Sequence, residues 1–323
     1  MHTSVWLNSS GIDVVVIRIA RSWLNILKSA TANWLESQAF VHAAALAFFT
    51  VFSIAPVVIV VVAVAGIFLG EMAAQGRIFE QLQDVLGSEA AEVVQTAVVN
   101  SQIDQGGLVP TLLGLAATVV GATTVFAQMQ QSLNQIWDVA PRPSRNSLWL
   151  FLQSRVLSLT IVLAIGFVLM VSLLLSVALR AVMGFAEQWL PVPGWTMISL
   201  ELVLSLTVIT LLFAAIFKIL PDVILGWRDV LAGAFITALL FTIGRSLIAI
   251  YLAQAAPAST YGAAGSLVIL LLWVNYSSLI LLFGAAVTRA HCQARGLEIR
   301  PRNTAVCVHR ELVEDGPRPA SGK

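Results

Sequence analysis

The sequence predicts an all-α membrane protein with six transmembrane helices, and two observations support this fold class. Hydrophobic residues make up 58% of the 323 positions and charged residues only 11%, with a mean hydropathy of +0.88. Soluble domains are about 45–50% apolar and about 25% charged, so this chain has too few charges to cover a surface that faces water. Six apolar stretches are also long enough to cross a bilayer, which takes about 20 helical residues.

The six predicted spans are residues 43–69, 108–127, 156–180, 199–220, 230–252 and 263–287. Only helices and closed barrels satisfy all backbone polar groups in lipid, and the alternating pattern of barrel strands does not occur in these stretches. We therefore expect a membrane domain over residues 43–290. A cytoplasmic segment (1–42) should precede it, and a cytoplasmic, disordered tail (291–323) should follow it.

Basic residues predict the orientation of the spans, because cytoplasmic loops are enriched in Lys and Arg. One side of the predicted membrane carries fifteen of the eighteen bases: Arg18, Arg21, Lys28, Arg142, Arg145, Arg155, Lys218, Arg228, Arg289, Arg295, Arg300, Arg302, Arg310, Arg318 and Lys323. The other side carries Arg77 and Arg180, and Arg245 falls within the fifth span. Both termini are therefore expected in the cytoplasm.

Two segments outside the spans have their own pattern. Residues 13–40 alternate apolar and polar positions at helical spacing, with Trp23 and Trp34 near the bases. This pattern is typical of an amphipathic helix at the membrane interface, and a lead-in helix packed on the bundle explains it equally well. Residues 71–106 contain six acids and one base. Gly87 suits a helix end and Ser88 a helix start, so we expect an exported helical hairpin.

Arg245 is the only full charge well inside a predicted span. A basic side chain at the centre of a membrane helix costs about 2.5–3.5 kcal/mol on insertion scales, so such residues usually face a bundle interior or a water-filled cavity. Three interpretations remain open for Arg245. It pairs with Glu201 near the exported end of the fourth span, it contacts an anionic ligand, or it extends to the lipid headgroups.

Other polar residues also lie within the spans and are candidates for lining a pathway at mid-depth. They are Asn275, Tyr276 and Ser277 in the sixth span, Ser53 and Pro56 in the first, and Thr123 and Thr124 in the second. Proline lacks an N–H and usually kinks a helix. The alternative is that these side chains serve as polar contacts between helices, worth about 0.6–2 kcal/mol each.

Small residues at four-residue spacing predict close helix packing. The pairs are Gly66 with Gly70, Ala117 with Gly121, and Gly233 with Thr237. Such spacing brings membrane helices together either within one chain or between copies of it, and we favour contacts within the chain.

The motifs of common enzymes do not occur. The four histidines (His2, His42, His291 and His309) form no His-x-x-x-His pair, and the sequence contains neither GxSxG nor a Walker phosphate loop. We therefore expect no enzyme activity, no cofactor and no metal site. A net charge of +1 also argues against a nucleic-acid partner, since nucleic-acid binders are usually strongly basic.

Four strings resemble the YihY/virulence factor BrkB family of bacterial inner-membrane proteins, formerly labelled ribonuclease BN. They are AAALAFFTVFSIAPVVIV (43–60), GATTVFAQMQQSLNQIW (121–137), LPDVILGWRDVLAGAF (220–235) and YGAAGSLVILLLWVNYSSLILLFGA (261–285). The residues that carry the resemblance, beyond those named above, are Asn134, Trp137, Pro221, Asp222, Trp227, Arg228, Gly244, Tyr251, Tyr261, Gly262, Gly265, Ser266 and Trp273. Two positions depart from the family pattern, which commonly has Tyr at Asn275 and an acid at Ala286.

This resemblance implies six spans and a location in the bacterial inner membrane. It favours a transporter or lipid- and solute-handling protein in envelope maintenance, in contact with the bilayer and with an anionic lipid or small solute. A structural scaffold is the alternative, with a homo-oligomer or an envelope partner bound through the 71–106 hairpin. The tRNA-processing nuclease of the old label is disfavoured, because no group of residues supports it. Ala286 weakens any proton-coupled mechanism, since the acid is missing.

Overall fold

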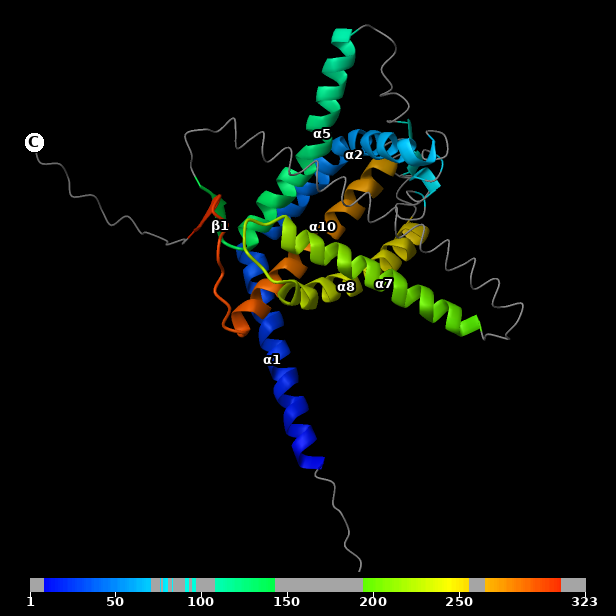
Figure 1. Cartoon of the computed structure of the whole chain (residues 1–323). Coiled ribbons are helices and arrows are strands. Elements are labelled where there is room, and N and C mark those ends of the chain that lie inside the picture. Colours follow the sequence, from blue (N-terminus) through cyan, green and yellow to red (C-terminus); the bar gives the residue numbers. More distant parts are fainter. Residues whose placement is uncertain are drawn as a thin grey trace, which may run out of the picture.

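The computed structural model describes residues 9–70, 108–142, 194–255 and 265–308, with short stretches between 76 and 96. Six long helices and a two-stranded ribbon form these parts of the chain (Figure 1). The helices are α1 (Ser9–Glu36), α2 (Ala39–Leu69), α5 (Leu108–Ile136), α7 (Gly194–Ile219), α8 (Trp227–Ala255) and α10 (Gly265–Ala294). The strands are β1 (Val139–Pro141) and β2 (Ala305–Cys307).

Five of the six predicted spans coincide with helices, namely α2, α5, α7, α8 and α10. The third predicted span, 156–180, lies outside the described residues. Three segments of the described chain are long and apolar enough to cross a membrane: Leu202–Ile219, Trp227–Ile248 and Leu267–Ala294. The bent pair formed by α1 and the start of α2 adds a fourth candidate. The protein is therefore an all-α membrane protein, and the count of six spans and their orientation stay predictions.

The chain bends sharply between α1 and α2. The helix segments Ala20–Glu36 and Ala39–Ile54 meet at 65°. Gln38 adopts a left-handed conformation with φ of 55°, which ends α1, and its carbonyl accepts the first backbone hydrogen bonds of α2 from Val41 and His42 at 3.0 and 3.2 Å. Most of the predicted amphipathic segment 13–40 thus belongs to α1, whose inner face packs on α10 with Ile26 and Ala30 in the shared core, and its last two residues begin α2.

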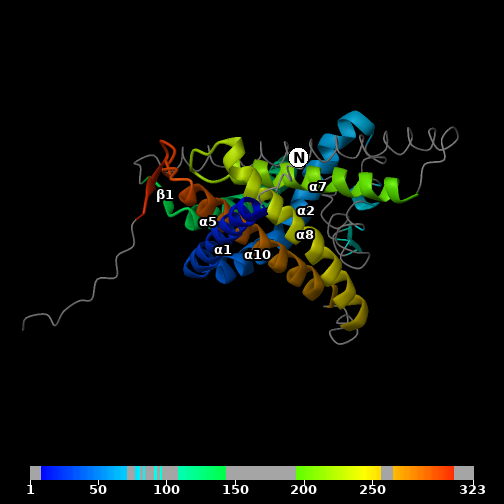
Figure 2. The same ribbon diagram turned by 90° about the horizontal axis from the view of Figure 1, so that it is seen from below.

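All six helices contribute to the main apolar core, which lies toward the end of the bundle where the ribbon is found. Its fully buried side chains include Leu133 of α5, Phe217 of α7, Val230 of α8 and Leu282 of α10. Many other core positions are alanines, which let the helix backbones approach closely. Figures 1 and 2 both place β1 and β2 at one end of the molecule, beside the end of α5. A smaller cluster packs Phe79, from the predicted hairpin, on Val58 of α2. Most of that hairpin lies outside the described residues.

The prediction of a disordered tail after residue 291 is wrong as far as residue 308. Strands β1 and β2 pair antiparallel, with Val139 opposite Cys307. The pairing continues where the Arg142 amide donates to the Thr304 carbonyl and the Val308 amide to the Asp138 carbonyl, both at 2.8 Å. This ribbon gives the polar segment backbone partners that its composition does not reveal. Residues 309–323 lie outside the described part.

Candidate functional site

Helices α8 and α10 meet along a seam of two reciprocal Gly–Thr pairs. An added Cβ on Gly233 would overlap Thr288 and lie 2.9 Å from the Gly284 carbonyl, and one on Gly284 would overlap Thr237. Each threonine hydroxyl donates to a carbonyl one turn earlier in its own helix, Thr237 to Gly233 at 2.7 Å and Thr288 to Gly284 at 2.8 Å. The predicted Gly233–Thr237 spacing therefore serves a contact within the chain, and α10 repeats the same spacing.

Aromatic side chains continue this seam toward the other end of the two helices. The rings of Phe241 and Trp273 meet edge to face with centroids 5.9 Å apart. Tyr276 covers Gly244 so closely that an added Cβ there would overlap the Tyr276 hydroxyl and lie 2.7 Å from Cζ. Only glycine leaves room for this ring. The seam thereby holds the Tyr276 hydroxyl against the backbone next to Arg245.

Arg245 continues the face that α8 turns toward the bundle. Residues spaced by four, seven and eleven positions share one helix face, which places Arg245 in line with Phe241, Ala238 and Ala234. Both alanines are fully buried and Phe241 also contacts Phe213 of α7, whereas the Arg245 side chain is exposed. The bundle-facing stripe of α8 is therefore buried or half-buried as far as Phe241 and becomes exposed at Arg245.

No acidic side chain contacts Arg245 among the residues that the structure describes. Glu201 lies on α7, but its side chain is outside the described set, so the predicted Arg245–Glu201 pair stays a prediction. The opposite face of α8 is apolar and exposed, as expected for a lipid contact. It carries Leu231, Phe235, Leu239, Ile243 and Leu247.

The remaining predicted pathway residues lie on α2, α5 and α10. Pro56 lies inside α2 and packs on Gly121 of α5, so that an added Cβ on Gly121 would lie 2.9 Å from proline Cγ. Ser53 and Thr123 are buried, and Thr123 donates to the Val120 carbonyl at 3.2 Å. Thr124 donates to the same carbonyl at 2.6 Å. Asn275 and Ser277 are half-buried on α10. The Thr123 and Thr124 hydroxyls thus bond within α5, as polar packing groups do.

Two predicted family residues form a polar cluster that ties α5 to the loop between α7 and α8. The Asp222 carboxylate accepts from Asn134 Nδ2 at 2.8 Å and from Gln130 Nε2 at 3.2 Å. The Asp222 amide donates back to Asn134 Oδ1 at 2.8 Å. Asn134 is 4% exposed. This reciprocal pairing explains an Asn at this position, because its amide group places a donor and an acceptor side by side in one plane.

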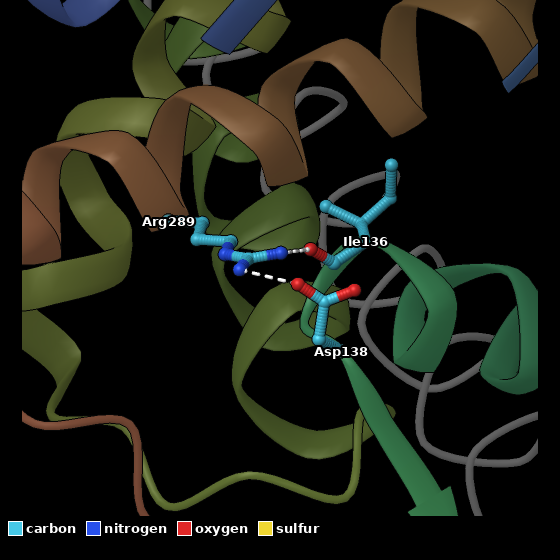
Figure 3. A network of polar contacts seen from close by, with 3 residues as sticks. All are labelled: Ile136, Asp138 and Arg289. Carbon is cyan, nitrogen blue, oxygen red and sulfur yellow. Dashed lines mark hydrogen bonds and ion pairs between the residues drawn. The ribbon is translucent and has the colours of Figure 1, made fainter. Parts of the chain in front are cut away.

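Arg289, which the sequence indicates only as a base on the cytoplasmic side, forms hydrogen bonds at the end of α5 (Figure 3). Arg289 donates to the Ile136 carbonyl and to the Asp138 carboxylate, both at 2.5 Å. Arg302 similarly donates to two carbonyls in the last turn of α7, at 3.2 and 3.1 Å. The last carbonyls of a helix lack partners within the helix and favour cations. Pairs separated by more than 80 residues gave no signal in the sequence.

The other predicted motif residues are placed as follows. Trp137 is buried beside Val139, and Pro221 and Asp222 precede α8, which begins at Trp227 and Arg228. Gly265 begins α10, whereas Tyr261 and Gly262 lie outside the described residues. An added Cβ on Gly70 would meet no atom within 4 Å, so that position makes no close helix contact, and the surroundings of Gly66 are not described. Ala286, where the family pattern has an acid, is fully buried in the apolar core.

Comparisons with known proteins place similar sequences in one family of membrane proteins. The family profile described as virulence factor BrkB matches residues 30–306. A UPF0761 membrane protein of Mannheimia succiniciproducens is 28% identical over 256 residues, which cover 76% of this chain and 82% of that protein. One from Vibrio cholerae is 27% identical over 281 residues, covering 84% of this chain and 88% of its own length. One from Xanthomonas oryzae is 27% identical over 257 residues, covering 79% and 58%. No solved structure matches the chain.

Proposed function

The chain belongs to the virulence factor BrkB family of membrane proteins, and we propose that it is a transporter or lipid-handling protein of the bacterial inner membrane. Both termini lie in the cytoplasm in this proposal, and the protein catalyses no covalent chemistry. The observation that carries the proposal is Arg245, an exposed cation that continues the bundle-facing stripe of α8. The ligand would be an anionic lipid headgroup or an anionic solute.

The energetics of an arginine in a membrane support an anionic ligand. A guanidinium carries five donors in a fork that fits phosphate and carboxylate groups. Leaving these donors without partners inside a bilayer is unfavourable, so membrane arginines usually face a partner or a water-filled path. The Tyr276 hydroxyl lies against Gly244, the residue before Arg245, and supplies a second polar group. Exposed apolar side chains of α8 beside Arg245, Ile243 and Leu247, suit acyl chains, which makes a phospholipid the favoured substrate class.

The function is tested with the full chain reconstituted into vesicles. Flip of a fluorescent anionic phospholipid and uptake of small anionic solutes are measured in parallel, which separates lipid from solute transport. Arg245→Ala should slow the active transport reaction about 10–100-fold, because a hydrogen bond to a charged group contributes about 1.5–3 kcal/mol. Arg300→Ala is the matched control, since it removes an arginine whose side chain is exposed in the tail. Wild-type rates from Arg245→Ala would remove the proposal's basis.

A further inference from the structure

Helix α1 has a second apolar face that its contact with α10 leaves uncovered. Ile26 and Ala30 are buried against the core, whereas Leu24 and Leu35 are 66% and 55% exposed and Leu27 is also exposed. The exposed residues 24, 27, 31 and 35 follow the i, i+3, i+7, i+11 spacing of a single helix stripe. The apolar sector of α1 is therefore wider than the part that α10 covers.

Basic side chains border this exposed stripe. Arg21 and Lys28 precede and follow Leu24 by three and four residues, so both lie beside it on the helix surface. Arg18 lies one turn before Arg21, and all three bases are exposed. The sequence has no acid between residue 13 and residue 36, and within the described residues none of the three bases forms an ion pair.

The bend after α1 extends the same apolar surface. Phe40 and Val41, at the start of α2, are exposed, and the rings of Trp34 and Phe40 lie 4.8 Å apart across the break. The 65° angle turns α1 well away from the direction of α2. A helix that continues from a membrane span at such an angle can lie along the bilayer surface instead of through it.

We propose that the exposed face of α1 is a binding surface for anionic phospholipids. The leucine stripe enters the boundary between headgroups and acyl chains, and Arg18, Arg21 and Lys28 contact lipid phosphates from its edge. Helices with an apolar face bordered by Lys and Arg bind membranes in this way, and each base near an anionic surface contributes about 1 kcal/mol. This surface is separate from Arg245 and does not depend on the proposed transport function.

The charge of this face argues against a second copy of the chain as its occupant. A two-fold contact would place the same patch of each copy against the other. The three bases of one α1 would then meet the three bases of its partner, and residues 14–35 contain no acid to pair with them. Anionic lipid is the occupant that complements both the charge and the apolar side chains.

The experiment uses the full-length protein in lipid vesicles, in a background with Cys292→Ala and Cys307→Ser. A fluorophore is attached through Thr31→Cys, on the exposed stripe, or through Ser29→Cys, on the opposite exposed side, as the matched control. Vesicles contain zwitterionic lipid with either brominated phosphatidylglycerol or brominated phosphatidylcholine. Bromine quenches a fluorophore that it touches, so the ratio of the two quenching signals measures the preference for anionic lipid at each position.

We expect the label at position 31 to be quenched more strongly by the anionic lipid, and the label at position 29 to show little quenching by either. Arg21→Gln and Lys28→Gln should each reduce the anionic preference about fivefold, whereas Arg21→Lys should keep it. Equal quenching by the two lipids at position 31, or an unchanged preference in the double Gln variant, would overturn the proposal. Loss of quenching accompanied by cross-linking between copies through position 31 would instead identify a dimer contact and also overturn it.

Discussion

The reciprocal Gly–Thr seam predicts that Gly284→Ala loosens the contact between α8 and α10. The new Cβ would overlap Thr237 Oγ1 and lie 2.9 Å from Thr237 Cβ and 3.0 Å from Phe217 Cζ. Thr237 cannot rotate away without breaking its hydrogen bond to the Gly233 carbonyl, which is 2.7 Å long. Because Phe217 is also fully buried, neither neighbour has space to move into.

The size of the effect follows from three contributions. Overpacking a core costs about 1–3 kcal/mol and the lost threonine hydrogen bond about 1 kcal/mol, while Ala in place of Gly in a helix returns about 1 kcal/mol. The net loss in free energy of unfolding is about 1–3 kcal/mol. At about 2 °C per kcal/mol for a long chain, the thermal midpoint should fall by roughly 2–6 °C.

The assay is the temperature at which half of the purified protein stays monodisperse in detergent. Gly76→Ala is the matched control, because Gly76 is an exposed helical glycine whose added Cβ would meet no atom within 4 Å. The double variant Gly284→Ala/Thr237→Gly should recover stability beyond the sum of its two single changes, since it moves the small residue across the seam. A Gly284→Ala midpoint equal to that of Gly76→Ala, or strictly additive changes, would refute the close packing.

Three further predictions concern the end of the bundle that carries the ribbon. Asn134→Leu should lower the free energy of unfolding by about 1–3 kcal/mol in a detergent melt, because the amide and carboxylate of the half-buried Asp222 lose a partner; a wild-type midpoint would contradict this role. Arg289→Gln should lower the free energy of unfolding by about 1–3 kcal/mol and make the ribbon susceptible to proteolysis, since the end of α5 loses its cation. An unchanged cleavage pattern would argue against this role of Arg289. In the folded protein a maleimide should label the exposed Cys307 and leave the buried Cys292 unmodified until detergent denaturation; rapid labelling of both thiols would show that the end of α10 is open.

The helices were predictable because membrane insertion acts on local composition. Uninterrupted apolar stretches are required wherever a chain crosses lipid, so the ranges of α7, α8 and α10 follow closely from hydropathy. The spacing of Gly233 and Thr237 also predicted a close contact. Its counterpart in α10, Gly284 with Thr288, was not recognised, because small residues in a long apolar run do not indicate which helix they face.

The ordered tail could not be predicted from composition. Val139 pairs with Cys307 across about half of the length of the chain, and a three-residue strand has no distinctive pattern. Arg302 illustrates the same difficulty, since a base after the last span is explained equally well by membrane topology. Its contact with the end of α7 depends on where the tail folds back.

The candidate site was predicted only in part. A charge inside an apolar span identifies Arg245 from sequence alone, and a polar group at mid-span identifies Tyr276, whereas Gly244 is indicated through the family resemblance. Their contact explains why a glycine precedes the arginine. The reciprocal hydrogen bonds of Asn134 and Asp222 likewise give a physical role to two residues that the sequence identifies only as motif positions.

The central claim is that Arg245 binds an anionic substrate where the bundle-facing side of α8 becomes exposed. The most direct measurement compares phospholipid flip by wild-type protein, Arg245→Lys and Arg245→Ala in the same vesicles. We predict that Arg245→Lys retains part of the rate, since it keeps the charge but loses the planar fork, and that Arg245→Ala falls about 10–100-fold. Equal flip and uptake rates from wild type and Arg245→Ala would contradict the claim.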